Sequence, residues 1–124
     1  MSEHRLQVAV AKLLDASGLL WTAIPNGGNR NVVTGAMLKA EGVKRGVPDI
    51  MVLEWFWPKT WPEEMTPTHG LFIELKDGAK GKVSEHQKEW LQRLNENGYR
   101  AEVCRSLDEV LTLLRECYPR VKFP

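Results

Sequence analysis

Residues 71–76 constrain the fold most, because two charged residues lie in an apolar run with the length of a buried strand. Side chains alternate across a strand, so Glu74 and Lys76 point to one face while Ile73 and Leu75 point to the other. Burying such charges costs several kcal/mol per ion unless they are paired or bind a metal. The segment therefore predicts a site for chemistry within the sheet.

A second apolar run starts directly after a third charged residue, Asp49. Residues 50–53 are all apolar and follow Gly46-Val47-Pro48-Asp49, so we expect a strand over 49–55. If this strand and 71–76 are antiparallel neighbours, the start of the first lies beside the end of the second. Asp49 would then meet Glu74 and Lys76 at one end of the sheet.

Such a group of charges suits a hard divalent cation and phosphate chemistry. Neighbouring carboxylates repel each other unless a cation lies between them, and oxygen ligands select Mg²⁺ or Mn²⁺ over zinc. A lysine beside them can hold the attacking water or stabilise the charge of the transition state. Glu3 and Gln87 each stand at the polar end of a predicted apolar helix face, from which they can reach the same site.

Each of these residues also has a structural interpretation. Glu3 is favoured by the dipole of its helix alone, and Gln87 is the capping-box partner of Ser84. The Glu-x-Lys pattern is compatible with an ordinary ion pair on one strand face, and Asp49 with a turn after Pro48. Only the joint arrangement favours a metal-dependent site.

The order of predicted elements indicates one domain spanning residues 1–124. We expect helices over 2–17, 36–41 and 84–97 and from 106 onward, with strands over 19–24, 49–55, 71–76 and 99–104. A Trp- and Pro-rich insertion at about 55–69 separates two of these strands. Long loops in compact domains are usually functional or disordered. Aromatic side chains exposed here would suit a dimer interface or stacking on unpaired bases; alternatively, Trp55 and Trp57 cover a sheet edge.

Composition limits the partners. With 17 Lys and Arg against 16 Asp and Glu, the net charge of +1 argues against indiscriminate nucleic-acid binding but permits a local basic groove. The sequence shows neither a signal-peptide pattern nor an apolar run long enough to span a membrane. Cys104 and Cys117 are expected to be free thiols in a reducing compartment. We therefore expect a cytoplasmic protein with no organic cofactor.

The motifs together resemble a known nuclease family. The pattern is similar to the PD-(D/E)XK superfamily and more narrowly to the VRR-NUC family. It consists of Gly46-Val47-Pro48-Asp49, then Glu74-Leu75-Lys76 with Glu74 25 positions after Asp49, then Ser84 and Gln87. The stretches 25–30 and 38–43 resemble those of stand-alone bacterial and phage members. The likeness extends from Glu3 to the last helix.

The resemblance implies an α/β fold with a central mixed sheet flanked by helices, the αβββαβ core of restriction endonucleases. It also implies Mg²⁺- or Mn²⁺-dependent hydrolysis of DNA phosphodiesters. Asp49 and Glu74 would bind the metal together with the backbone carbonyl of Leu75, and Glu3 is a further candidate ligand. Lys76 would be the catalytic lysine and Gln87 a residue that orients the site.

Small stand-alone members of this family look like structure-selective endonucleases that act as homodimers on four-way (Holliday) junctions, in a bacterial cell or a phage-infected host. The alternative for this chain is a catalytically silent DNA-binding or assembly module on the same fold. Candidate phosphate contacts are Arg30, Lys39, Lys44, Arg45, Lys80, Lys82 and Lys88. Lys80 and Lys82 are the best of them, because they directly follow the Glu-x-Lys strand.

Overall fold

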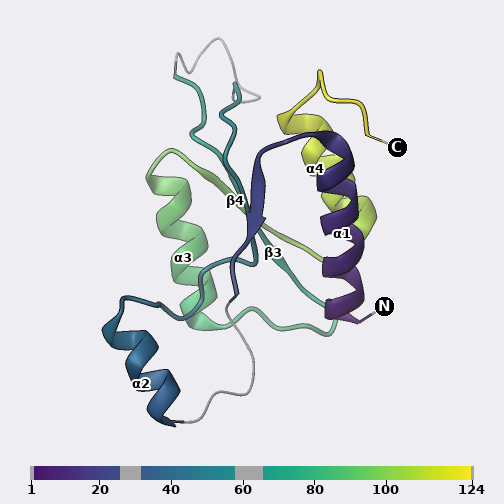
Figure 1. The fold of residues 1–124 in the computed structure, drawn as a ribbon. Helices are drawn as coiled ribbons and strands as arrows, with labels where there is room; N and C mark the ends of the chain where they lie inside the picture. Colours follow the sequence, from purple (N-terminus) through teal and green to yellow (C-terminus); the bar gives the residue numbers. More distant parts are fainter. Residues whose placement is uncertain (1, 26–31, 58–65, 124) are drawn as a thin grey trace.

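The computed structural model describes residues 2–25, 32–57 and 66–123. Within those ranges the elements follow the predicted order (Figure 1). They are α1 (Glu3–Ser17), β1 (Trp21–Ala23), α2 (Val32–Ala40), β2 (Ile50–Val52), β3 (Leu71–Leu75), α3 (Glu85–Glu96), β4 (Arg100–Cys104) and α4 (Leu107–Cys117). Helix α2 is longer than the expected 36–41, and β1 and β2 are shorter than the predicted strands.

The strands form one mixed sheet in the order β1-β2-β3-β4. Strands β1, β2 and β3 are antiparallel neighbours, whereas β4 runs parallel to β3. The predicted antiparallel pairing of β2 with β3 is therefore confirmed, with Ile50 opposite Ile73 and Val52 opposite Leu71. This register, continued by one residue, brings Asp49 beside Glu74.

Helices cover both faces of the sheet, with α1 and α4 on one side and α3 on the other (Figure 1). Strand alternation sends Ile73 and Leu75 into the larger cluster with the apolar faces of α1 and α4. Phe72 points the other way and packs with Leu94 of α3. Every residue of β3 is buried, because this central strand has a neighbour on each edge and helices on each face.

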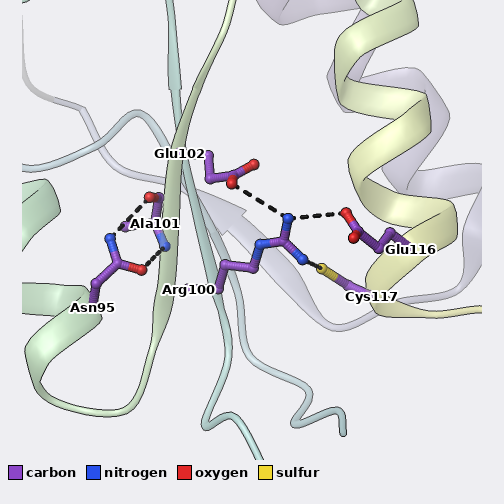
Figure 2. Close-up of polar contacts among 6 residues, drawn as sticks. All are labelled: Asn95, Arg100, Ala101, Glu102, Glu116 and Cys117. Atoms are coloured by element: carbon purple, nitrogen blue, oxygen red, sulfur yellow. Dashed lines mark hydrogen bonds and ion pairs between the residues drawn. The ribbon is translucent and has the colours of Figure 1, made fainter. Parts of the chain in front are cut away.

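Strand β4 is joined to α4 through its first residue, Arg100 (Figure 2). The guanidinium donates to the carboxylates of Glu102 at 3.3 Å and Glu116 at 2.9 Å, and to the Cys117 Sγ at 3.7 Å. Burial raises the pKa of Cys117 to about 12 and that of Cys104 to about 12. Both cysteines are free and buried, so they act as apolar core residues rather than reactive thiols.

The outer edge of β4 is capped at Ala101 by one side chain, that of Asn95. The Arg100 N–H donates to the Gly70 carbonyl on the β3 side, so strand alternation turns the backbone groups of Ala101 outward. The Asn95 side chain of α3 bonds both of these groups at 3.1 Å, donating to the carbonyl and accepting from the N–H (Figure 2). An open strand edge invites pairing with another chain, and Asn95 closes this edge at Ala101.

Replacing Asn95 by alanine is expected to lower the free energy of unfolding by about 1–3 kcal/mol, because it leaves the N–H and carbonyl of Ala101 without protein partners. Urea unfolding followed by circular dichroism measures the loss. Gln92→Ala is the matched control, since Gln92 is exposed on the same helix and bonds Glu96 at 2.9 Å. Equal losses in the two variants would show that the contact with β4 is unimportant.

The ends of the predicted insertion lie within the described residues, and residues 58–65 lie outside them. Phe56 pairs with Thr68 in an isolated antiparallel bridge, and its buried ring meets Tyr118 edge-on at 5.2 Å. Trp55 and Trp57 are 60% and 50% exposed, with ring centroids 5.8 Å apart. These two indoles thus present apolar surface to solvent. None of the described helices combines the length and apolar character that crossing a membrane requires.

Candidate metal centre

Carboxylates from three separate parts of the chain converge at one end of the sheet. Oxygen atoms of Glu3, Asp49 and Glu74 all lie within 4.8 Å of one another. Glu3 comes from the first turn of α1, Asp49 directly precedes β2, and Glu74 lies in β3. Residues that are far apart in the sequence and were each predicted to reach one site are thus brought together.

Asp49 is fixed through both its side chain and its backbone. Its Oδ2 accepts a hydrogen bond from the Leu75 N–H at 2.7 Å, and its carbonyl accepts from the Ile24 N–H at 2.7 Å. Because the N–H and carbonyl of one strand residue point the same way, the Leu75 carbonyl also faces the β2 side. Two hydrogen bonds therefore hold Asp49 beside the end of β3.

Glu74 is the most unusual group of the cluster. Its side chain is 2% exposed, and its Oε2 is buried without a hydrogen-bond partner among the described residues. The pKa of Glu74 is raised to about 9, and burial is the largest cause. A hydrogen bond with Asp49 and the negative charges of Asp49 and Glu3 also raise this pKa, while the positive charge of Lys76 lowers it. In the metal-free protein these surroundings thus favour the protonated form of Glu74 over the ionised form.

This donor set fits a hard divalent ion. Buried polar atoms without a partner are rare in native proteins, and a site for a bound ion is one of their explanations. All three side chains offer carboxylate oxygens, which Mg²⁺ and Mn²⁺ prefer. A cation among them would give the Glu74 oxygen a partner, relieve the repulsion with Asp49 and displace the proton.

Lys76 lies at the same end of the sheet as the carboxylates. It is 8% exposed, and its backbone N–H donates to the Cys104 carbonyl at 3.0 Å. Its positive charge acts on Glu74, lowering the pKa of that carboxyl against the effect of burial. The following turn packs over Lys76, since a Cβ built on Gly81 would lie 3.1 Å from the Lys76 Cβ. The ammonium group is thus presented by a buried, well-packed stem.

Gln87 is engaged in the start of α3. Its side-chain oxygen accepts from the Ser84 N–H at 2.9 Å, and its own N–H donates to the Ser84 Oγ at 3.2 Å. This is the predicted capping box. The backbone of Gln87 lies against Gly46, three residues before Asp49, so α3 begins beside the segment that carries a proposed metal ligand. A direct role of Gln87 in orienting the site stays a prediction.

Gly46 has a positioning role that the sequence reasoning did not assign. Its φ is +87°, and a Cβ at this position would lie 2.5 Å from the His86 carbonyl carbon and 2.8 Å from the Gln87 nitrogen. Only glycine allows so close an approach of two backbones. The one signal in the sequence is its place in Gly46-Val47-Pro48-Asp49, which shows neither the left-handed φ nor the contact with α3.

Gly46→Ala is expected to destabilise the protein by about 1–3 kcal/mol beyond the strain of positive φ, because α3 or the segment before Asp49 must move. Weaker binding of Mn²⁺ should accompany this loss. Gly42→Ala is the control, since Gly42 has a φ of +100° but nothing within 4 Å of its added Cβ. Thermal unfolding and Mn²⁺ titration of both variants measure the difference, and equal behaviour would contradict the positioning role.

Of the predicted phosphate contacts, Arg30 lies outside the described residues, and the others lie on the surface. Lys39, Lys44 and Arg45 follow one another along α2 and the turns before Asp49, and all three are exposed. Lys80 and Lys82 are also exposed, in the segment that follows Lys76. Lys88 is exposed as well, and its Nζ pairs with the Glu85 carboxylate at 3.2 Å. Such exposed ion pairs contribute little to stability, and Glu85 offsets part of the Lys88 charge.

Comparisons with known proteins agree on one family. The sequence profile of the VRR-NUC domain matches residues 1–108. A solved structure described as "VRR_NUC domain protein" superposes with a TM-score of 0.73 at 22% identity, covering 96% of this chain and 89% of the other. A second, described as "VRR_NUC domain", gives a TM-score of 0.61 at 22% identity, covering 93% and 96%. No curated protein matches the chain.

Proposed function

Because the chain belongs to the VRR-NUC domain family, and thus carries a nuclease-type domain, we propose that it is a divalent-metal-dependent endonuclease that hydrolyses DNA phosphodiester bonds. The observation that carries the metal dependence is the buried Glu74 Oε2 without a partner, in a carboxylate cluster whose oxygens lie within 4.8 Å of one another. A bound Mg²⁺ or Mn²⁺ supplies positive charge against the negative charge that develops on the phosphate in the transition state.

The side chains around the cluster divide the work. Asp49 and Glu74 hold the ion together with the Leu75 carbonyl, which faces the same side as the Leu75 N–H bonded to Asp49. Glu3 adds a third carboxylate from α1. The hydrogen bond from the Leu75 N–H keeps Asp49 in place, so the site needs little rearrangement when the ion and DNA bind.

Lys76 provides the fixed positive charge beside the reacting phosphate. Its stem is buried, so the ammonium is held in one region and loses little freedom when substrate arrives. There it holds the attacking water or stabilises the transition state. Gln87, at the start of α3, helps to orient the site. The DNA backbone is held by basic side chains, namely the exposed Lys39, Lys44, Arg45, Lys80, Lys82 and Lys88, together with Arg30.

We further propose that the substrate is branched DNA, such as a four-way junction, and that the enzyme acts as a homodimer in the cytoplasm of a bacterial or phage-infected cell. Exposed apolar residues support the homodimer. Leu53 and Leu20 are neighbours, because the Leu53 N–H donates to the Leu20 carbonyl at 2.8 Å, and they are 48% and 61% exposed. Trp55 and Trp57, which follow Leu53 in the sequence, are 60% and 50% exposed. A second copy of the chain would cover this apolar surface. A twofold dimer would present one metal centre to each of two opposed DNA strands of a junction.

Cleavage of four-way junction, flap, nicked and plain duplex DNA tests this proposal. We expect cleavage with Mg²⁺ or Mn²⁺, none with EDTA, and a preference for the four-way junction. Light scattering should give twice the mass of one chain. Tight binding of branched DNA without cleavage in either metal would instead identify a silent DNA-binding module. A monomer that still cleaves junctions would remove the dimer from the proposal and leave the enzyme.

A further inference from the structure

One arginine outside the carboxylate cluster connects the end of β4 to the turn that follows Lys76. The Arg105 Nη1 donates to the Gly78 carbonyl at 2.7 Å and to the Gly81 carbonyl at 2.6 Å. Arg105 itself follows β4 directly, and its backbone N–H donates to the Glu109 carboxylate at 3.3 Å. The base of this side chain is thus fixed at the start of α4, and its tip is fixed on the turn.

Besides these two bonds, the turn is held at Gly81, which packs against Lys76. The Gly81 N–H donates to the Asp77 carbonyl at 3.0 Å, and Gly78 has a φ of +48°. Residues 77–80 are all exposed, so apolar packing contributes little there. Hydrogen bonds from a charged donor are about twice as strong as neutral ones. The two bonds from Arg105 therefore hold the exposed part of this turn against the end of β4.

We propose that Arg105 is a positioning residue for DNA binding. It fixes the turn that presents Lys80 and Lys82 to the phosphate backbone, next to Lys76. The inference rests on the proposed function for the identity of the ligand. The Arg105 Nη1 bonds two carbonyls of the turn, so the structure ties this guanidinium to the turn that carries the two lysines.

A double-mutant cycle tests this mode of action. Arg105→Met keeps the length of the apolar stem and removes the donors; it should weaken binding of a labelled four-way junction roughly three- to tenfold, measured by fluorescence anisotropy in EDTA. In a Lys80→Ala/Lys82→Ala background the same substitution should have almost no further effect. Additive losses would show that Arg105 contacts DNA itself and would overturn the inference.

Hydrogen exchange gives a second readout that does not depend on cleavage. The backbone amides of residues 78–82 should exchange faster in Arg105→Met, while Arg115→Met, an exposed arginine of α4, leaves them unchanged. Arg105→Lys should fall between wild type and Arg105→Met, and it serves if the methionine variant does not fold. Unchanged exchange in the turn would refute the positioning role. Faster exchange in a protein that cleaves no DNA would refute the nuclease activity alone.

Discussion

Replacing Lys76 by methionine is expected to slow cleavage of a four-way junction by roughly 10²- to 10³-fold, with DNA affinity changed only a few-fold. Lys76 is 8% exposed, and methionine fills much of the space of its stem without the charge. The fold should therefore survive while the positive charge beside the reacting phosphate is lost. Single-turnover cleavage with Mg²⁺ and anisotropy without it separate the two effects.

The matched control for this experiment is Lys12→Met. Lys12 is an exposed lysine on α1, so its substitution removes one positive charge away from the carboxylate cluster. Its cleavage rate should stay close to that of wild type. If Lys76→Met cleaved as fast as Lys12→Met, Lys76 would have no part in the chemistry.

Glu74→Gln is expected to change stability in opposite directions with and without metal, and to abolish cleavage. In EDTA near pH 8 the variant should be more stable than wild type, because an amide needs no proton to be neutral in this buried place. With Mn²⁺ present it should be less stable, because the weakened site gains less from the ion. Thermal unfolding under both conditions measures the reversal.

The pH dependence follows from the raised pKa of Glu74. Its value of about 9 in the folded protein lies above the ordinary 4.5, so the folded state binds more protons than the unfolded state between these values. The metal-free protein should therefore lose stability as pH rises through this window, by up to about 1.4 kcal/mol per pH unit from this group. Urea unfolding in EDTA should show this loss in wild type and a flatter profile in Glu74→Gln.

Glu89→Gln controls for the removal of one carboxylate, because Glu89 is exposed on α3. Its pH profile should match that of wild type. Should Glu74→Gln destabilise the protein equally in EDTA and in Mn²⁺, the Glu74 carboxylate would have only a structural role, and the metal centre would have to be abandoned.

The pairing of Asp49 with Glu74 could be predicted because it follows from local rules. Apolar runs identified β2 and β3, alternation placed Glu74 and Lys76 on one face, and antiparallel pairing brought Asp49 to the end of β3. The register of Ile50 with Ile73 confirms this part. The mixed sheet and its helical cover are also confirmed.

Contacts set by the packing of distant elements follow less directly from the sequence. Glu3 could be placed at the polar end of an apolar helix face, but its distance from Asp49 and Glu74 depends on where α1 packs on the sheet. The close approach of Gly46 to α3 and the bonds from Arg105 to Gly78 and Gly81 join segments whose sequences contain no mutual signal. Strand β2 ends at Val52, and the apolar Leu53 that follows it is 48% exposed rather than buried.

The most direct measurement is anomalous diffraction from crystals of the protein soaked in Mn²⁺. The account predicts a peak in contact with the carboxylates of Asp49 and Glu74, with Glu3 beside it. A second acidic region provides an internal comparison: the groove between β4 and α4 is lined by residues that include Glu102, Asp108, Glu109 and Glu116. A peak in that groove alone, or none beside Glu74, would contradict the metal centre.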